Sequence, residues 1–187
     1  MELNEALERV KPLLTPKRYA HTMRVLDTAL ELAGKWGADE KVTALTAALH
    51  DCAKNITKYI MPVYGGFIGD FAHYPEVSHA PLGALYAGDV LKITNRRVLA
   101  GIWYHCTGRP AMPLEEKIVY LADALEPGRD YDGVERLRTL LKESLDLAVR
   151  EYARSNLSYL REQGGLIHPL GKQTFEYYNK LLEGNNE

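Results

Sequence analysis

The chain has 187 residues, of which 26% are charged and 46% hydrophobic, the balance of a globular protein with a hydrophobic core. The formal net charge of −2 excludes the broadly basic surface of a protein that wraps nucleic acid, and two cysteines are too few for a disulfide framework. Because no apolar run is long enough to span a membrane and the N-terminus does not read as a signal peptide, we expect a cytoplasmic protein with no membrane partner.

The first part of the chain is predicted to be helical. Apolar side chains recur at helical spacing over residues 3–14. Thr15 is then followed by Pro16, the order expected of an N-cap and the first position of a second helix. This helix is predicted to run to about Lys35, because Gly37 follows it.

The remaining elements are also predicted as helices, with one long exception. The stretch MPVYGGFIGDFAHYPEVS, residues 61–78, is rich in Gly and Pro and is predicted to be an irregular, mobile loop. The predicted helices are a third one from the N-cap Asp39 to about His50, patterns over residues 79–91, 95–105 and 113–126, a long pattern from Val134 to about Glu162, and a last helix after a turn at His168 and Pro169.

No alternation of apolar and polar residues that is typical of strands is found. The sequence therefore predicts an all-α fold, a helical bundle formed by one domain over residues 1–187. Its core is expected over about residues 16–130, and C-terminal helices are expected over residues 133–184.

Four histidines and two carboxylates are candidate metal ligands. Asp123 lies in the apolar run IVYLADALE, where a carboxylate is costly unless it is paired or bound to a cation. Imidazole and carboxylate together suit Zn, Mn, Fe, Co or Ni better than Ca or Mg. The spacing lets successive helices each supply a ligand to the core of a bundle. In order, the set is His21, His50, Asp51, His79, His105 and Asp123.

His50 and Asp51 are neighbours at a predicted helix end. Adjacent side chains on a helix point about 100° apart, but they can converge where the backbone turns. Asp51 has two oxygens and is predicted to bridge two metal ions, while His50 holds one.

Each of these residues also has an ordinary interpretation. His21 alone could be a hydrogen-bonded core residue, and His79 and His105 could be helix caps or surface residues. Asp123 alone could accept a hydrogen bond from a buried N–H. Only the ordered set indicates a metal centre. The two cysteines, Cys52 and Cys106, lack the paired spacing of a zinc knuckle and are predicted to serve packing.

The motifs RYAHTMRV, ALHDCAKN, VSHAPLGA, YHCTGRPAMPLEEKIVYLAD and EPGRDYDGVERLR resemble those of a known family. The H…HD…D order is similar to that of the HD-domain metal-dependent phosphohydrolases, and more closely to the YqeK family of bacterial HD proteins. The resemblance runs from about Arg18 to His168. It implies an HD-type helical bundle that cleaves diadenosine tetraphosphate symmetrically into two ADP, by attack of a hydroxide between two metal ions on phosphorus.

The resemblance also implies the cofactors. Two divalent transition-metal ions are expected, with iron favoured and Mn, Co, Ni or Zn accepted in its place. The first ion would be held by His21, His50, Asp51 and Asp123. The second would be held by Asp51, His79 and His105.

Charge on the phosphates calls for cationic side chains near the metals. Lys54 follows His50 by one helical turn, and catalytic roles are assigned to Asp51 and Lys54. The expected substrate contacts are the cations Arg18, Lys54, Arg109 and Arg129, together with the hydroxyl of Thr107 and the backbone N–H of Gly108. The ordinary interpretation of each cation is a solvated surface charge.

Two further functions stay open from the sequence. One is a nucleotidase that acts on mononucleotides, and the other is a nucleotide-binding sensor without catalysis. The expected partner in each case is a nucleotide or a dinucleoside polyphosphate, not nucleic acid. Exposed apolar residues in the last two helices also permit a homodimer.

Overall fold

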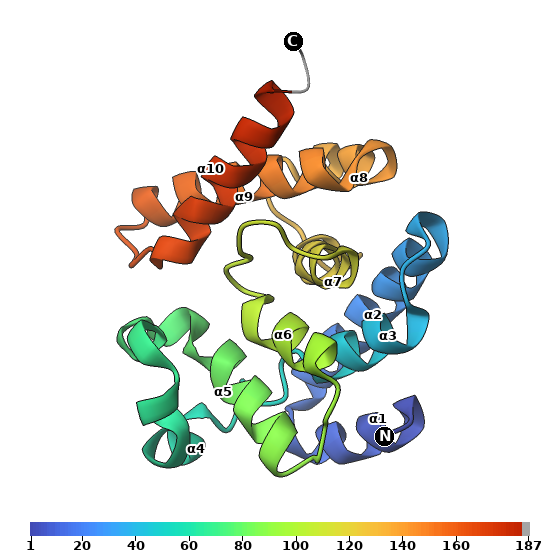
Figure 1. Ribbon diagram of the computed structural model, residues 1–187, viewed down its shortest axis with the longest axis vertical. Helices are drawn as coiled ribbons and strands as arrows, with labels where there is room; N and C mark the ends of the chain where they lie inside the picture. Colours follow the sequence, from blue (N-terminus) through green and yellow to red (C-terminus); the bar gives the residue numbers. More distant parts are fainter. Residues whose placement is uncertain (185–187) are drawn as a thin grey trace.

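The computed structural model describes residues 1–184. Most segments that show the 3.6-residue hydrophobic periodicity are helical in it. These residues form α-helices and short 3-10 helices and no β-strand, so the predicted all-α fold is confirmed (Figure 1). In chain order the α-helices are α1 (Leu3–Val10), α2 (Pro16–Trp36), α3 (Glu40–Leu49), α4 (Thr57–Tyr64), α5 (Pro75–Asp89), α6 (Arg96–Tyr104), α7 (Leu114–Leu125), α8 (Val134–Glu143), α9 (Leu145–Glu162) and α10 (Pro169–Glu183).

The predicted boundaries of α2 and α3 are confirmed by their caps. The hydroxyl of Thr15 accepts a hydrogen bond from the backbone N–H of Arg18 at the start of α2. Gly37 ends this helix with a φ of 72°, a conformation that is easiest for glycine. Asp39 caps α3 by accepting a hydrogen bond from the backbone N–H of Val42. The two helices are joined by a short turn and pack against each other.

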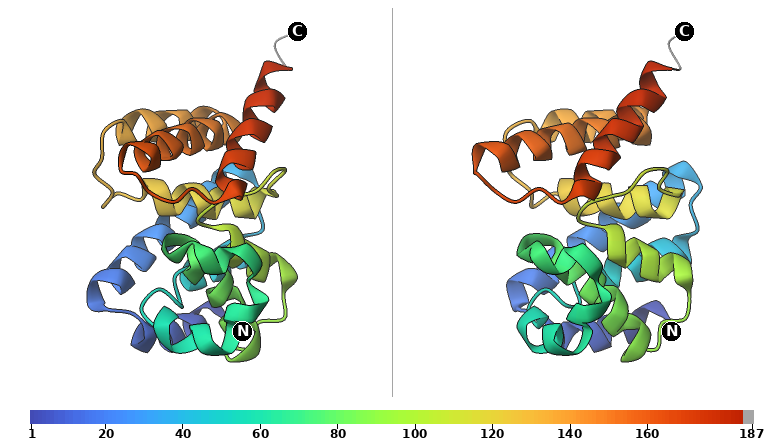
Figure 2. Two further views of the ribbon diagram at one scale, coloured as in Figure 1. Left: turned by 90° about the vertical axis from the view of Figure 1, so that its left-hand side faces the viewer. Right: turned by 60° about the vertical axis from the view of Figure 1, so that its left-hand side comes forward.

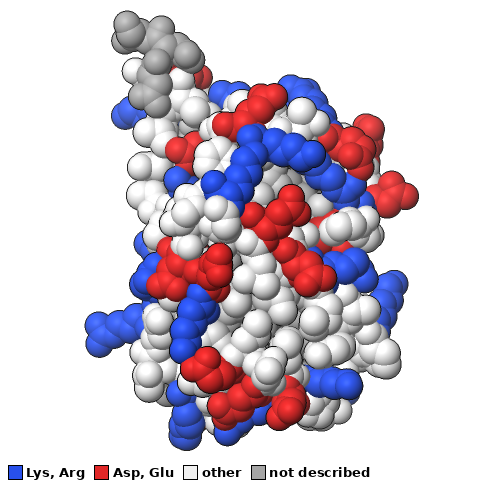
Figure 3. Space-filling model, turned by 90° about the vertical axis from the view of Figure 1, so that its right-hand side faces the viewer, with Lys and Arg blue, Asp and Glu red and all other residues white. Residues whose placement is uncertain are grey.

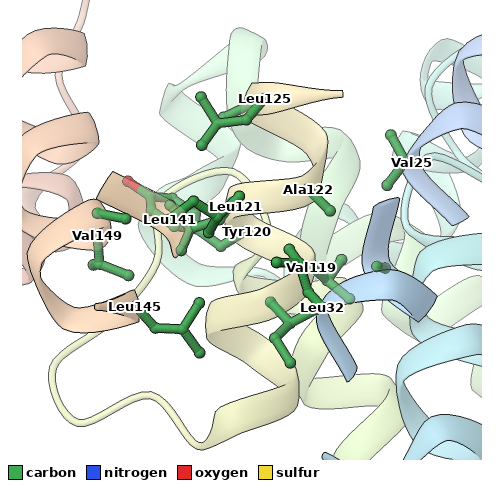
Figure 4. Packing of buried hydrophobic residues seen from close by; sticks show 14 of the residues in the cluster. Val25, Leu32, Val119, Tyr120, Leu121, Ala122, Leu125, Leu141, Leu145 and Val149 are labelled. Atoms are coloured by element: carbon green, nitrogen blue, oxygen red, sulfur yellow. The ribbon is translucent and has the colours of Figure 1, made fainter. Parts of the chain in front are cut away.

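Helix α7 lies between the C-terminal helices and the rest of the bundle (Figures 1 and 2). Residues 118–122 are all buried, which fits a stretch of helix that is apolar on every side and must be covered on every side. In the close view, Leu121 lies toward Leu141 of α8, and Val119 lies toward Leu32 of α2 (Figure 4). Burial of one such side chain contributes roughly 1.5–3 kcal/mol.

The same hydrophobic cluster takes side chains from α2, α3, α7, α8, α9 and α10. It therefore contains residues from both the expected core and the expected C-terminal helices. The assignment of residues 1–187 to a single domain stays a prediction.

A second cluster joins α1, α3, α5 and α6, and it brings α3 and α6 very close together. A Cβ on Gly101 of α6 would lie 2.5 Å from Cγ2 of Thr46 in α3, so only glycine permits this approach. His50 follows α3 directly, and His105 follows α6 directly. The close packing of the two helices therefore brings these two histidines near each other.

The prediction of an irregular, mobile loop over residues 61–78 is wrong for most of this stretch. Helix α4 enters this stretch, two short 3-10 helices follow, and α5 begins before it ends. Ile68 is 1% exposed and Phe71 is 5% exposed, and both belong to a small cluster with Ile60 and Leu82. These contacts join residues from separate elements. The Gly and Pro content of the stretch therefore did not indicate that it would be buried and mostly helical.

The single long helix predicted from Val134 to about Glu162 is also wrong, because it is two helices. Ser144 is extended, with φ −157° and ψ 124°, and its hydroxyl accepts a hydrogen bond from the N–H of Leu147. The break places Leu141 of α8 and Leu145 of α9 in the same buried cluster. An N-cap serine inside a continuous apolar pattern was the available signal.

Among the described residues, no helix combines the length and the apolar character that crossing a bilayer requires. On the face shown in Figure 3, basic and acidic side chains are interspersed. This distribution matches the near-neutral formal charge of the chain.

His168 links the start of α10 to the 3-10 segment before α5. Its Nδ1 accepts a hydrogen bond from the N–H of Leu170, and its ring stacks on Phe71 at a centroid distance of 4.0 Å. Burial lowers the pKa of His168, although Asp70 opposes the shift. The neutral ring is therefore the form that the fold needs.

We predict that His168 makes the protein less stable in mild acid. Because the pKa of His168 is lowered in the folded state, its contribution is complete above the unfolded pKa of about 6.5 and is lost as the pH falls below that value. Between about pH 7.5 and about pH 5.5, the unfolding free energy of His168→Asn should fall less than that of the wild type, because asparagine keeps a cap that does not titrate. Urea denaturation at the two pH values measures the difference.

The matched control is His73→Asn, since His73 is exposed and is the last residue of the same 3-10 segment, Gly69–His73. It should retain the pH dependence of the wild type. Equal pH dependence in wild type and His168→Asn would show that the cap does not carry the effect.

Candidate metal centre

Five separate segments of the chain meet at one group of polar side chains. His21 comes from α2, His79 from α5 and Asp123 from α7, while the other three residues directly follow α3 and α6. The side chain of Asp123 is 21% exposed, and each of the others is at most 7% exposed. The structure thus brings together the whole predicted set, which is His21, His50, Asp51, His79, His105 and Asp123.

Asp51 lies in the middle, and its two carboxylate oxygens face different histidines. Oδ2 is 3.5 Å from Nε2 of His50 and 3.9 Å from Nε2 of His21. Oδ1 is 3.2 Å from Nε2 of His79 and 3.7 Å from Nε2 of His105. A carboxylate in this position can bind two cations at once.

Asp123 completes one of these two sets. Its Oδ1 lies 3.0 Å from Nε2 of His21 and 4.0 Å from Nε2 of His50. We refer to His21, His50, Asp51 and Asp123 as the first group. The second group is His79, His105 and the same Asp51.

The adjacent residues His50 and Asp51 converge because α3 ends at Leu49. The chain continues in turns, and the N–H of Cys52 donates to the carbonyl of Leu49. Both side chains can then face one point, which adjacent positions inside a helix cannot do.

Backbone carbonyls orient two of the imidazole rings. Nδ1 of His50 donates to the carbonyl of Ala47 at 2.7 Å, and Nδ1 of His105 donates to the carbonyl of Ile102 at 2.8 Å. A carbonyl only accepts, so Nδ1 carries the proton in both rings. The lone pair on Nε2 of each ring therefore points into the centre, the tautomer that a metal ligand needs.

Glu126 orients the ring of His21 and was not identified from the sequence. Its Oε1 accepts a hydrogen bond from Nδ1 of His21 at 3.0 Å, and its Oε2 accepts from Nε of Arg24 and from the N–H of Gly128, both at 2.5 Å. Burial alone would raise the pKa of Glu126, but these donors outweigh burial and lower it to about 2. Glu126 is thus a carboxylate that fixes the tautomer of His21.

Two buried lone pairs in the first group lack a hydrogen-bond partner within the described residues. They belong to Nε2 of His21 and Nε2 of His50. Nε2 of His21 lies only 3.0 Å from a carboxylate oxygen of Asp123, but with the proton on Nδ1 both atoms are acceptors. Such a contact is unfavourable unless a cation lies between the atoms, so the donor set fits a bound divalent metal.

The charges in the centre also favour a cation. Burial would raise the pKa of Asp51, yet His50, His105 and His79 hold it well below its usual range. Burial would also raise the pKa of Asp123, yet the neighbouring His21 and His50 lower it. Both carboxylates are therefore ionised.

Three of the predicted cations lie beside the centre. Nη1 of Arg18 is 2.9 Å from Oδ2 of Asp51, and Nη2 of Arg129 is 2.6 Å from Oδ1 of Asp123. Nζ of Lys54 is 3.3 Å from Nδ1 of His79. Each of them reaches a residue of the predicted ligand set.

The other predicted substrate contacts are engaged elsewhere. Arg109 forms a two-pronged ion pair with Glu116, at 2.8 and 2.9 Å. The hydroxyl of Thr107 donates to the carbonyl of Gly108, and the N–H of Gly108 donates to the carbonyl of Tyr104. These groups therefore already have partners in the described structure, and the role of the three residues in substrate binding stays a prediction.

The prediction that both cysteines serve packing holds for Cys52 and is wrong for Cys106. Cys52 is fully buried, and its thiol donates to the carbonyl of Gly83. Cys106 instead contacts the second group through its sulfur, and with His79 and His105 it forms a set that could hold a metal ion. Its position next to His105 was the available signal.

Comparisons with known proteins agree with this geometry. The family model described as HD domain matches residues 18–128. "Bis(5'-nucleosyl)-tetraphosphatase, symmetrical" of Halalkalibacterium halodurans is 39% identical over 97% of this chain and 98% of its own length. The protein of the same name from Bacillus subtilis is 36% identical over 99% of this chain and all of its own length.

A solved structure is also similar. It is described as a predicted HD superfamily hydrolase involved in NAD metabolism, from Clostridium acetobutylicum. The TM-score is 0.89 at 30% identity, over 96% of this chain and 98% of that one. The chain therefore belongs to the HD domain family, in the branch that contains the symmetrical bis(5'-nucleosyl)-tetraphosphatases.

Proposed function

We propose that the protein is a metal-dependent hydrolase of dinucleoside polyphosphates, which splits diadenosine tetraphosphate into two ADP. The observation that carries the proposal is the position of Asp51, whose two oxygens face two separate groups of histidines. The names of the full-length relatives support this substrate. In the reaction, water adds to one of the two central phosphorus atoms, and the bridging oxygen leaves with the other ADP.

The first group would hold one ion and the second group another, with Asp51 as the shared ligand. Imidazole nitrogen and carboxylate oxygen accept Fe, Mn, Co, Ni and Zn, and iron is favoured by the resemblance to the YqeK family. When bound, such a pair of ions activates water at neutral pH and offsets charge on the phosphoryl oxygens.

Two arginines hold the polyphosphate chain over the centre. The side chain of Arg18 is 31% exposed and that of Arg129 is 37% exposed, while each also contacts a buried carboxylate. Both guanidinium groups therefore face the centre and solvent at once. This is the position from which they bind a phosphate at the metals.

Lys54 becomes a third phosphate ligand once the second group is filled. In the structure its ammonium group faces Nδ1 of His79. A metal bound to Nε2 of His79 would leave the ring proton on Nδ1, and Nδ1 could then no longer accept from Lys54. The ammonium group needs another acceptor, and a phosphate oxygen next to the metals supplies it.

A cavity beside Arg129 takes one nucleoside. Its volume is about 680 Å³, and its lining includes Arg129, Tyr131, Tyr152 and Asn156. This volume is in the range of small-molecule sites, and tyrosine rings and an asparagine amide suit a base. Because Arg129 belongs to both the cavity and the centre, a nucleoside bound there has its phosphates directed toward the metals.

The product assay tests the function. Anaerobically purified protein loaded with Fe(II), Mn(II) or Co(II) should convert diadenosine tetraphosphate into ADP alone. Asp51→Ala should lose both the activity and most of the bound metal, because it removes a ligand from both ions. Chromatography of nucleotides and elemental analysis measure the two effects.

Other products would contradict the proposal. Nucleoside and phosphate released from mononucleotides, with no ADP from the dinucleotide, would make the protein a nucleotidase. Tight nucleotide binding without turnover in all three metal forms would make it a sensor.

Glu126→Gln should weaken metal binding in the first group about 10- to 100-fold, because a carboxylate behind a histidine ligand raises its basicity and fixes its orientation. Competition with a chelator measures the affinity. Glu116→Gln is the matched control, since Glu116 is also a buried carboxylate paired with an arginine but contacts Arg109. Equal metal affinity in the two variants would show that Glu126 does not contribute to metal binding.

Arg129→Gln should lower kcat/KM for diadenosine tetraphosphate about 10- to 100-fold with metal content unchanged, since a charged hydrogen bond contributes roughly 1.5–3 kcal/mol. Arg109→Gln should remain near wild type, because Arg109 pairs with Glu116. Steady-state kinetics and metal analysis of both variants provide the measurement. A larger loss in Arg109→Gln would reverse these assignments.

A further inference from the structure

The second group of the centre has a sulfur atom in it. Sγ of Cys106 lies 3.2 Å from Nε2 of His105 and 3.3 Å from Nε2 of His79. These two nitrogens also face Oδ1 of Asp51, at 3.7 and 3.2 Å. Four potential donor atoms from three segments of the chain thus surround one point.

Hydrogen bonds link the four donor atoms of this group. Nδ1 of His105 donates to a carbonyl, so its Nε2 can accept only from the thiol of Cys106. Nδ1 of His79 accepts from Lys54, so its Nε2 carries a proton and donates to Asp51. Both protons point into the space between the four donor atoms.

The separations suit donors on one ion. Metal–nitrogen bonds of about 2.0–2.1 Å and metal–sulfur bonds of about 2.3 Å place neighbouring donors about 3.0–3.6 Å apart at angles of about 90–110°. The two sulfur–nitrogen distances are 3.2 and 3.3 Å. Cys106 therefore stands where a fourth ligand of the second ion belongs.

We propose that Cys106 is a thiolate ligand of the ion in the second group, together with Asp51, His79 and His105. When the ion binds, the thiol proton passes to solvent and the proton on His79 moves from Nε2 to Nδ1. The proposal rests on the metal centre of the proposed function and adds a donor to it.

A sulfur donor changes which ions the second group prefers. Thiolate is a soft ligand that favours Zn, Co and Fe over the hard Mn ion, whereas the first group offers only nitrogen and oxygen. The two positions of one centre therefore differ in selectivity. Partial loading with mixed metals should place the softer ion in the second group.

The test uses Co(II)-loaded protein without substrate. Wild type should show a thiolate-to-Co(II) charge-transfer band in the near ultraviolet, and Cys106→Ser should lose it. Cys52→Ser should keep the band, because Cys52 is also next to a ligand in sequence but its thiol contacts Gly83. Cobalt content and circular dichroism, measured on each variant, show whether the centre and the fold persist.

A second measurement needs no substitution. Co(II) or Zn(II) should protect Cys106 of the wild type from alkylation by iodoacetamide, as followed by peptide mass spectrometry. A protein that binds two Co(II) per chain and cleaves diadenosine tetraphosphate, but shows no band and no protection, would overturn this proposal and leave the proposed function standing. A protein that binds no Co(II) would overturn both.

Discussion

The buried carboxylate of Asp51 is the group on which the arrangement of the centre depends. Its two oxygens point in opposite directions, to His21 and His50 on one side and to His79 and His105 on the other. An ionised carboxylate with 3% exposure is costly unless cations or donors surround it. Helices from the whole first two thirds of the chain have to meet at this residue, so the position of Asp51 constrains the packing of α2, α3, α5, α6 and α7.

Hydrogen bonds behind the rings prepare the centre for metal. Carbonyls of Ala47 and Ile102 hold the rings of His50 and His105 by the same contact to a residue three positions earlier, and Glu126 does this for His21. In each ring the free lone pair faces inward. The second group differs, because the two ring nitrogens of His79 contact Lys54 and Cys106 instead of a carbonyl or a glutamate. This difference is the physical basis for the proposal that the centre has two metal positions with unlike chemistry.

The C-terminal helices affect the centre through α7. They cover the face of α7 away from α2, and Asp123 is the polar residue within the apolar second half of this helix. The loop after α7 carries Glu126 and Arg129, which contact His21 and Asp123. The cavity beside Arg129 is lined by residues of α9 as well, so a helix outside the matched residues 18–128 shapes the cavity proposed for the nucleoside.

What the sequence determined by itself is local or ordered along the chain. Hydrophobic periodicity and the caps at Thr15 and Asp39 determined most helices, because helical contacts join residues three and four apart. The order of His21, His50, Asp51, His79, His105 and Asp123 indicated a common centre. The tertiary structure alone decided the rest: the burial that makes residues 61–78 mostly helical, the pairing of Arg109 with Glu116, and the positions of Glu126 and Cys106 beside the histidines. Apart from the adjacency of Cys106 and His105, each of these depends on a contact between side chains from different elements, and no spacing along one helix contains that information.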